Sequence, residues 1–243
     1  MRIMFLNVQS PPYERAAKLF EYLSSFEVDV YVLSELSSGE GSLKLMTNLQ
    51  TVGFQVHWER PQKRSYSVAI AVKDIHHKAV SWPSSPDPCR FKTVRMRINS
   101  QEFALFGTYF PSLNRANMHK RRTYLESLEP FIRSALANKE RCVIFGGDIN
   151  DIPSWHIPKI FDYSMEGHVV TKMLDRLGFV DLAKIYLPRG TYTWFDHRGA
   201  GQLLDAMYIN EEHKYLVKEY YVYDGVRTKG LSDHSALIVE LSA

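Results

Sequence analysis

Short apolar runs rich in β-branched residues alternate along the chain with segments whose apolar residues recur at helical spacing. The first instance predicts strand, helix, strand, because the apolar runs from Ile3 to Val8 and from Val28 to Leu33 flank the helical pattern of Ala16 to Leu23. The same alternation continues toward the C-terminus. It predicts one mixed α/β domain over residues 1–243, since no internal repeat or long linker divides the chain.

The later apolar runs predict a sheet-rich middle and end of the chain. Further strands are expected at residues 68–72, 94–98, 103–109, 142–145, 204–209, 220–223 and 236–241. Further helices are expected at residues 43–49, 117–139 and 172–177. Pro130 lies inside the longest of these and should kink or divide it. Periodicity does not give the order of the strands.

Composition excludes several classes of protein. Hydrophobic residues make up 45% and charged residues 23% of the chain, which does not fit a disordered protein, a collagen-like repeat or a membrane bundle. No apolar run is long enough to span a membrane, and the N-terminal run becomes polar at Asn7, too early for a signal peptide. Cys89 and Cys142 do not make a disulfide framework. A reduced, cytoplasmic protein without membrane attachment is therefore expected, as a monomer with no inferred protein partner.

The net charge of +3 permits a polyanionic partner without identifying one, so any preference must come from local clusters. Lys63 and Arg64 precede the predicted strand at 68–72, and Arg121 and Arg122 belong to a basic segment after Tyr109. Clusters of this kind contact phosphates in nucleic-acid-binding proteins, although they are also common on solvated faces. They favour DNA as a partner.

Polar and ionisable residues stand where the apolar runs end: Asn7, Glu35, Tyr109, Asp148, Asn150, Asp233 and His234. If those strand ends meet at one edge, they form a carboxylate-rich pocket with one histidine, one phenol and two amides. Oxygen ligands favour Mg²⁺, or Mn²⁺, over zinc, which prefers sets of cysteine and histidine.

Six motifs occur in a fixed order: Leu6-Asn7-Val8, Leu33-Ser34-Glu35, Gly107-Thr108-Tyr109-Phe110-Pro111, Gly146-Gly147-Asp148-Ile149-Asn150, Leu204-Asp205 and Ser232-Asp233-His234. In this order the sequence resembles the endonuclease/exonuclease/phosphatase superfamily, most of all its exonuclease III and apurinic/apyrimidinic endonuclease branch. The resemblance implies a four-layer α/β sandwich, with two β-sheets face to face and helices outside. It also implies metal-assisted hydrolysis of a phosphate ester by water.

The resemblance further implies a role for each residue. Glu35 is the main metal ligand, Asn7 orients the metal or its water, and Asp233 binds a metal or tunes His234. Asp148 aligns and deprotonates the attacking water, helped by Asn150. His234, hydrogen-bonded to Asp205, stabilises charge on the phosphate, and Tyr109 donates to the phosphate or to the leaving oxygen.

Taken singly, these residues also admit structural roles. Asn7 could form a turn, and Glu35 could face solvent at the end of a strand. Tyr109 could pack within the sheet, and Asp148 or Asp233 could form a turn or a cap. Their joint occurrence in order favours one site.

The substrate is less constrained than the reaction. The segment Thr193-Trp194-Phe195 resembles the family's pocket for an abasic sugar or displaced nucleotide, with Trp194 as a wall. Gln9 stands where the family usually has Asn or Asp, and Leu203 stands where it usually has Arg. Three hypotheses follow: a Mg²⁺-dependent DNA phosphodiesterase that leaves a 3′-hydroxyl, an enzyme for a small phosphate ester such as a nucleotide or phosphoinositide, and a non-catalytic nucleic-acid-binding module.

Overall fold

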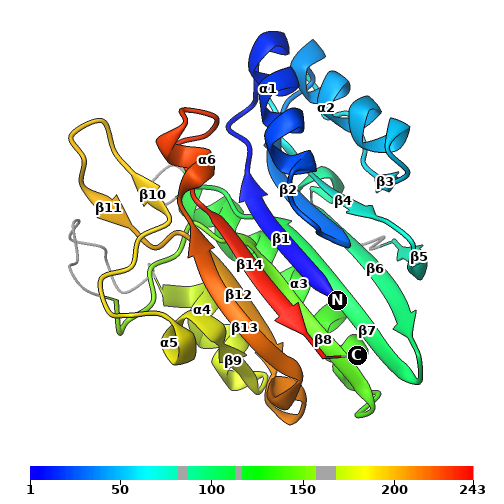
Figure 1. Ribbon diagram of the computed structural model, residues 1–243. Coiled ribbons are helices and arrows are strands. Elements are labelled where there is room, and N and C mark those ends of the chain that lie inside the picture. Colours follow the sequence, from blue (N-terminus) through cyan, green and yellow to red (C-terminus); the bar gives the residue numbers. More distant parts are fainter. Residues whose placement is uncertain (82–86, 113–116, 157–167, 243) are drawn as a thin grey trace.

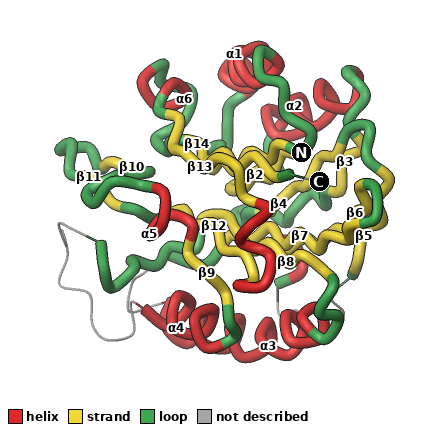
Figure 2. The backbone as a smooth tube through the Cα atoms, turned by 60° about the horizontal axis from the view of Figure 1, so that its bottom comes forward, coloured by secondary structure: helices red, strands yellow, loops and turns green. Residues whose placement is uncertain are grey.

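The computed structural model describes residues 1–81, 87–112, 117–156 and 168–242. Two six-stranded sheets lie face to face, and helices cover their outer faces (Figure 2). Both sheets mix parallel and antiparallel pairs. The structure therefore confirms the expected four-layer α/β sandwich.

The first sheet carries the N-terminal strands at its centre and the C-terminal strand beside them (Figure 1). Its order is β13 (Val217–Tyr223), β14 (Ala236–Leu241), β1 (Arg2–Asn7), β2 (Val30–Leu36), β4 (Ser67–Val72) and β3 (Gln55–His57). The central pair β1 and β2 is parallel, so both strands end at the same edge of the sheet. That edge contributes the first half of the site described below.

The second sheet contains the middle of the chain. Its order is β5 (His76–Val80), β6 (Phe91–Ile98), β7 (Gln101–Tyr109), β8 (Arg141–Asp148), β12 (Asp205–Asn210) and β9 (Phe179–Asp181). Here β7 and β8 are the parallel pair, and Tyr109 lies in register with Asp148 at their ends. A separate two-stranded ribbon, β10 (Trp194–Phe195) with β11 (Gly201–Gln202), projects from the sandwich (Figure 1).

The longer helices lie on the outer faces of the two sheets, whereas α5 (Leu182–Tyr186) packs against the cluster between them. Within the described residues, the α-helices are α1 (Tyr13–Ser24), α2 (Glu40–Thr51), α3 (Met118–Leu136), α4 (Val169–Arg176), α5 and α6 (Gly225–Thr228), and 3-10 helices include η1 (Pro88–Arg90) and η4 (Glu211–Leu216). Helices α1 and α2 pack on the first sheet, and α3 and α4 on the second (Figure 2). A third apolar cluster fills the space between the sheets, where side chains from both inner faces are buried and stabilise the sandwich by the hydrophobic effect.

One expectation about local structure needs correction, and some short strands were not predicted. Pro130 does not divide the long helix, because α3 runs without interruption from Met118 to Leu136. Pro130 is exposed, so water can hydrogen-bond the carbonyl group that it leaves without an internal donor. The short strands β3, β5 and β9 were not expected.

Within the described residues, no helix combines the length and the apolar character needed to cross a lipid bilayer.

Candidate active site at the strand ends

The site forms where the ends of central strands from both sheets meet. Asn7 ends β1 in the first sheet, while Asp148 ends β8 in the second. The Asn7 side-chain amide Nδ2 donates to Asp148 Oδ2 at 2.9 Å, and both side chains are buried. This bond joins the two sheets, so residues separated by 141 positions in sequence are fixed next to each other.

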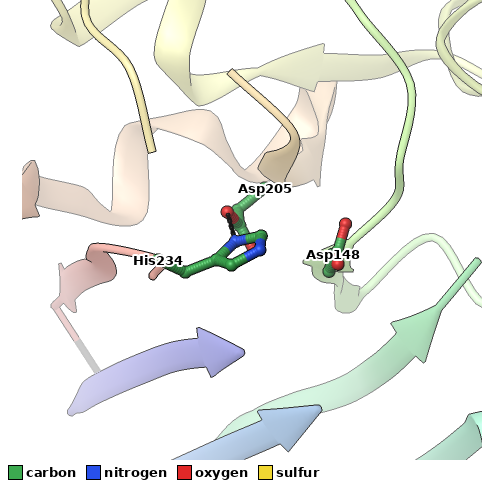
Figure 3. A group of neighbouring side chains, drawn as sticks. All are labelled: Asp148, Asp205 and His234. Carbon is green, nitrogen blue, oxygen red and sulfur yellow. Dashed lines mark hydrogen bonds and ion pairs between the residues drawn. The ribbon is translucent and has the colours of Figure 1, made fainter. Parts of the chain in front are cut away.

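His234 precedes β14 and pairs with Asp205 at the start of β12. The ring Nδ1 lies 2.7 Å from Asp205 Oδ2, so Nδ1 carries a proton and donates it to the carboxylate. Figure 3 shows the ring between Asp205 and Asp148, with its second nitrogen on the side of Asp148. Ligand atoms of these three residues lie within 4.8 Å of one another. The expected His234–Asp205 hydrogen bond is thus present in the structure.

The acids and the histidine change each other's protonation. Burial raises the pKa of Asp148 to about 7, with a further rise from Asp205 and an opposing effect of His234 and Asn7. Burial alone would lower the pKa of His234, but the contact with Asp205, together with the charges of Asp148 and Asp233, outweighs burial and raises that pKa to about 10. At neutral pH His234 is therefore a cation held beside two carboxyl groups, and Asp148 can both accept and release a proton.

Glu35 lies at an irregularity near the end of β2. The pairing of β2 with β4 shifts register between Leu33 and Leu36, and Glu35 has a left-handed backbone with φ of 60°. Such a conformation is rare for a residue other than glycine and points to a local constraint. Burial raises the pKa of the Glu35 carboxyl, while a hydrogen bond from Asn7 lowers it and Asp233 raises it. These effects place Glu35 among the site residues.

Gly147 is required for the approach of β8 to β7. Its φ is 136°, and a β-carbon at this position would lie 2.1 Å from the carbonyl oxygen of Thr108. Only glycine fits such a contact, because no real β-carbon comes so close to a backbone atom. The glycine next to Asp148 therefore permits the backbone path that delivers the carboxylate to the site.

Asp233 is oriented by the projecting ribbon. Trp194 Nε1 donates to Asp233 Oδ2 at 3.1 Å, and Trp194 also forms an isolated β-bridge with His234. The other carboxylate oxygen of Asp233, Oδ1, is buried and has no hydrogen-bond partner within the described parts of the chain. A buried, unpaired carboxylate oxygen is unfavourable unless a cation or a donor approaches it.

Two groups of residues could hold a divalent cation. The compact group Asp148, Asp205 and His234 has one oxygen and one nitrogen already bonded to each other, so its capacity for ligands is reduced. Glu35 and Asp233 instead offer carboxylate oxygens, among them the unpaired Oδ1 of Asp233. Hard cations prefer such oxygens. Glu35 and Asp233 therefore fit Mg²⁺ or Mn²⁺. The side-chain amide oxygen of Asn7, which accepts a hydrogen bond from the backbone nitrogen of Gln9, could serve as a further ligand.

Tyr109 and Asn150 lie beside this group. Tyr109 is buried at the end of β7, and its burial, with the charges of Asp148 and Glu35, raises the pKa of the phenol, which therefore stays protonated. Asn150 has a left-handed φ of 46° and donates from Nδ2 to the Phe110 carbonyl at 3.0 Å. Its amide nitrogen is thus engaged with the backbone in this conformation, while Tyr109 remains an acid available as a donor.

The residues expected to bind nucleic acid divide into two kinds. Lys63, Arg64 and Arg122 are exposed, and Trp194 is half-buried. Arg121 is only 1% exposed and donates from Nη1 to the Pro111 carbonyl at 2.5 Å. The expectation that Arg121 contacts DNA is therefore wrong for this conformation. Its helical spacing to the buried Tyr124, three positions later, is a signal in the sequence that it lies on the inner face.

Several positioning residues were missed by the sequence analysis. Thr193 Oγ1 accepts from the backbone nitrogens of Leu204 and Asp205, at 3.1 and 3.2 Å, and so fixes the start of β12. Arg90 packs 4.5 Å over the Tyr109 ring and donates to the Tyr109 carbonyl at 3.2 Å. Thr193 belongs to the segment compared with the family's pocket, but nothing in the sequence indicates that its hydroxyl holds the backbone of β12, and Arg90 lies outside the motifs.

Comparison with solved structures gives matches over the whole chain. An AP endonuclease from Archaeoglobus fulgidus has a TM-score of 0.78 at 19% identity, with 100% of both chains covered. A 3′ phosphatase from Neisseria, bound to a product DNA hairpin, has a TM-score of 0.76 at 24% identity, again with 100% of both chains covered. Truncated TDP2 from Caenorhabditis elegans has a TM-score of 0.71 at 17% identity, covering 100% of this chain and 97% of that one.

No protein-family model matches the chain, and no curated protein matches its sequence. The structural matches show that the chain has the fold of the endonuclease/exonuclease/phosphatase superfamily. At sequence identities this low, structural similarity shows a shared fold, and the function is inferred from the residues of the site.

Proposed function

We propose that this chain is a divalent-cation-dependent phosphodiesterase that hydrolyses DNA, of the exonuclease III or abasic-site endonuclease type, and leaves a 3′-hydroxyl. One observation carries the proposal: the His234–Asp205 pair and Asp148 lie beside Glu35 and Asp233, whose Oδ1 is buried without a partner. An acid–base set next to an oxygen-rich cation site suits the attack of water on a phosphate ester.

The roles follow from protonation and position. Asp148, with its pKa raised to about 7, accepts the proton of the attacking water. His234 is cationic through its contact with Asp205 and stabilises the negative charge that develops on the phosphate oxygens. Tyr109, a buried neutral phenol, donates to the phosphate or the leaving oxygen, and Asn150 helps to hold the water or the phosphate.

Glu35, Asp233 and Asn7 would hold Mg²⁺ or Mn²⁺. Such an ion, when bound, supplies positive charge to the phosphate and lowers the pKa of water. Trp194 orients Asp233 through its indole nitrogen. It thereby links the cation site to the ribbon that we propose lines the substrate pocket.

DNA is the substrate that the surface and the structural matches favour. Lys63, Arg64 and Arg122 are exposed cations in segments near the strand ends, and phosphate contacts by such residues give salt-dependent binding. The Neisseria match is described as bound to a DNA hairpin. The burial of Arg121 removes one expected DNA contact, which keeps hydrolysis of a small phosphate ester as the second candidate.

The test is one panel of digests with Mg²⁺ or Mn²⁺, using abasic, nicked and intact DNA duplexes and a set of small phosphate esters. We expect metal-dependent strand cleavage with a 3′-hydroxyl product, lost in Asp148→Asn and His234→Ala. Release of phosphate from small esters without cleavage of DNA would instead select the second candidate. DNA binding without turnover of any substrate would contradict both.

A further inference from the structure

Arg15 lies near the start of α1, directly after the turn that follows β1, and its side chain joins two loops of the site. Its Nη1 donates to the carbonyl oxygen of Val8 at 3.1 Å and to that of Leu231 at 2.6 Å. Its Nη2 donates to the carbonyl oxygen of Gln9 at 2.5 Å. One guanidinium group therefore bonds the turn after β1 and the loop before β14, which lie at opposite ends of the sequence.

The turn held by Arg15 has an unfavourable backbone. Gln9 and Ser10 are consecutive left-handed residues, with φ of 51° and 42°, and neither is glycine. Such conformations persist only where the surroundings determine them. The Ser10 nitrogen donates to the carbonyl oxygen of Glu35 at 2.9 Å, and Glu35 is itself left-handed. The strained turn is thus bonded directly to the backbone of Glu35.

The other end of the Arg15 contact leads to the acid–base half of the site. Leu231 is followed by Ser232, whose Oγ donates to the Asn7 carbonyl at 2.6 Å and accepts from the His234 nitrogen at 3.1 Å. A displacement of Leu231 would therefore move the backbone that carries Asp233 and His234. Arg15 and Ser232 are two separate cross-links between the same pair of loops.

Arg15 acts on the backbone and does not face a substrate. The donors described above are engaged with three carbonyl groups that belong to two loops. Burial lowers the pKa of Arg15, and the charges of Asp233 and Glu35 partly oppose this lowering, so the guanidinium group interacts with the acids of the site. The planar fork of a guanidinium can serve several acceptors at once, whereas the ammonium group of lysine cannot reproduce that geometry.

We propose that Arg15 is a positioning residue that sets the distance between the Asn7–Glu35 half and the Asp233–His234 half of the active site. This inference rests on the proposed function for its turnover readout, and it adds a residue that the motifs do not include. It predicts that loss of Arg15 weakens cation binding and lowers kcat, and that a small guanidinium ion in solution can take over its contacts.

The experiment compares Arg15→Ala and Arg15→Lys with Arg141→Ala as a matched control. Arg141 is buried, whereas Arg15 is partly exposed; Arg141 donates to the carbonyl of Ala135 at 3.2 Å, pairs with Glu102 at 3.3 Å, and lies at the opposite end of β8 from Asp148. For each protein we would measure the melting temperature, kcat, KM, the Mg²⁺ concentration for half-maximal rate, and the effect of millimolar guanidinium.

For Arg15→Ala we expect kcat to fall and the Mg²⁺ requirement to rise by about 10- to 100-fold, the range typical of groups that orient metal ligands. Guanidinium should restore at least part of kcat in Arg15→Ala and have no such effect on Arg15→Lys or Arg141→Ala. A folded Arg15→Ala with unchanged kcat and Mg²⁺ requirement would overturn the proposal. So would a loss of rate that follows the unfolded fraction and shows no guanidinium rescue.

A second measurement separates this proposal from the proposed function. Mn²⁺ binding, followed by electron paramagnetic resonance of the free ion, needs no substrate. Weaker Mn²⁺ binding by Arg15→Ala than by wild type and Arg141→Ala would support the positioning role even if the wild-type protein hydrolysed none of the substrates tested. Equal Mn²⁺ affinity in all three proteins would overturn it.

Discussion

Asp148 and Asp151 are neighbours in the sequence, both are almost completely buried, and burial raises the pKa of each to about 7. Their partners differ. Asp151 Oδ2 accepts from the backbone nitrogens of Val170 and Thr171, at 2.9 and 3.2 Å, and so caps the start of α4. Asp148 instead faces the amide of Asn7 and the side of the His234 ring that is not bonded to Asp205 (Figure 3).

The comparison shows that burial and a raised pKa do not by themselves identify a catalytic acid. Asp151 is held by backbone donors at Oδ2, and its Oδ1 lies 4.0 Å from the guanidinium of Arg121, which stays charged and does not exchange protons. Asp148 is surrounded by side chains that titrate or that can bind a cation. The identity of the partners therefore distinguishes a chemical role from a structural one.

The largest expected difference is in kcat, between Asp148→Asn and Asp151→Asn. Asp148→Asn keeps an acceptor for the Asn7 amide but removes the base, so we expect kcat to fall by about 10³-fold or more. Its melting temperature should not decrease, because a buried acid is replaced by a neutral group. Single-turnover cleavage and thermal unfolding check this. A variant that retains a tenth of the wild-type rate would contradict the role of Asp148.

Asp205→Asn should have a smaller effect that depends on pH. Without the carboxylate, the pKa of His234 falls from about 10, because burial then disfavours the charged ring. We expect a loss of about 10²-fold near pH 7. The loss should grow as the pH rises and His234 becomes neutral, whereas the wild type should keep its rate to about pH 9. Identical pH–rate profiles for the two proteins would contradict the assigned role of the pair.

Asp151→Asn should change stability and leave turnover within about threefold of wild type. The raised pKa of Asp151 means that the folded state holds a proton which the unfolded state releases above its ordinary pKa of 3.8. This stabilisation is complete below pH 4 and is lost as the pH rises to about 7. The free energy of unfolding of the wild type should fall across that window, by up to about 1.4 kcal/mol per pH unit more than in the variant.

Denaturant unfolding at pH 4, 5, 6 and 7, in the presence of a chelator, measures the difference between the two proteins. An equal dependence of the free energy of unfolding on pH in the two proteins would contradict the assigned protonation of Asp151. A large loss of kcat in folded Asp151→Asn would erase the contrast with Asp148.

The smallest expected effect is on DNA binding, and it should distinguish Arg122 from its neighbour Arg121. Arg122 is exposed, and we expect Arg122→Ala to weaken DNA binding and reduce its salt dependence by about one phosphate contact. Arg121 is buried against the Pro111 carbonyl, so Arg121→Met should lower the melting temperature without changing the salt dependence. Fluorescence anisotropy at several salt concentrations checks both. The opposite pattern would mean that α3 presents a different face to DNA.

The sequence predicted the elements whose periodicity is strong. The expected strand at 236–241 coincides with β14, and the polar residues at the strand ends could be identified because apolar runs stop there. The short strands β3 and β9 were missed, since three residues carry too little periodicity to be distinguished from a loop. Their place at the sheet edges follows from tertiary packing.

The geometry of the site depended on features that a sequence does not display. The left-handed backbone of Glu35 arises from a register shift between β2 and β4. The contact of Arg15 with Leu231 joins positions 216 residues apart. Neither leaves a local pattern, because each depends on segments that the sequence separates: β2 with β4 for Glu35, and the two ends of the chain for Arg15.

The central claim is that water, activated beside Asp148, attacks phosphorus in DNA. Single turnover of a DNA duplex in ¹⁸O-labelled water, with mass spectrometry of the products, tests it most directly. The account predicts one ¹⁸O in the new 5′-phosphate and none in the 3′-hydroxyl, with no labelled product from Asp148→Asn. Label in the 3′-hydroxyl, or unlabelled cleavage products, would contradict it.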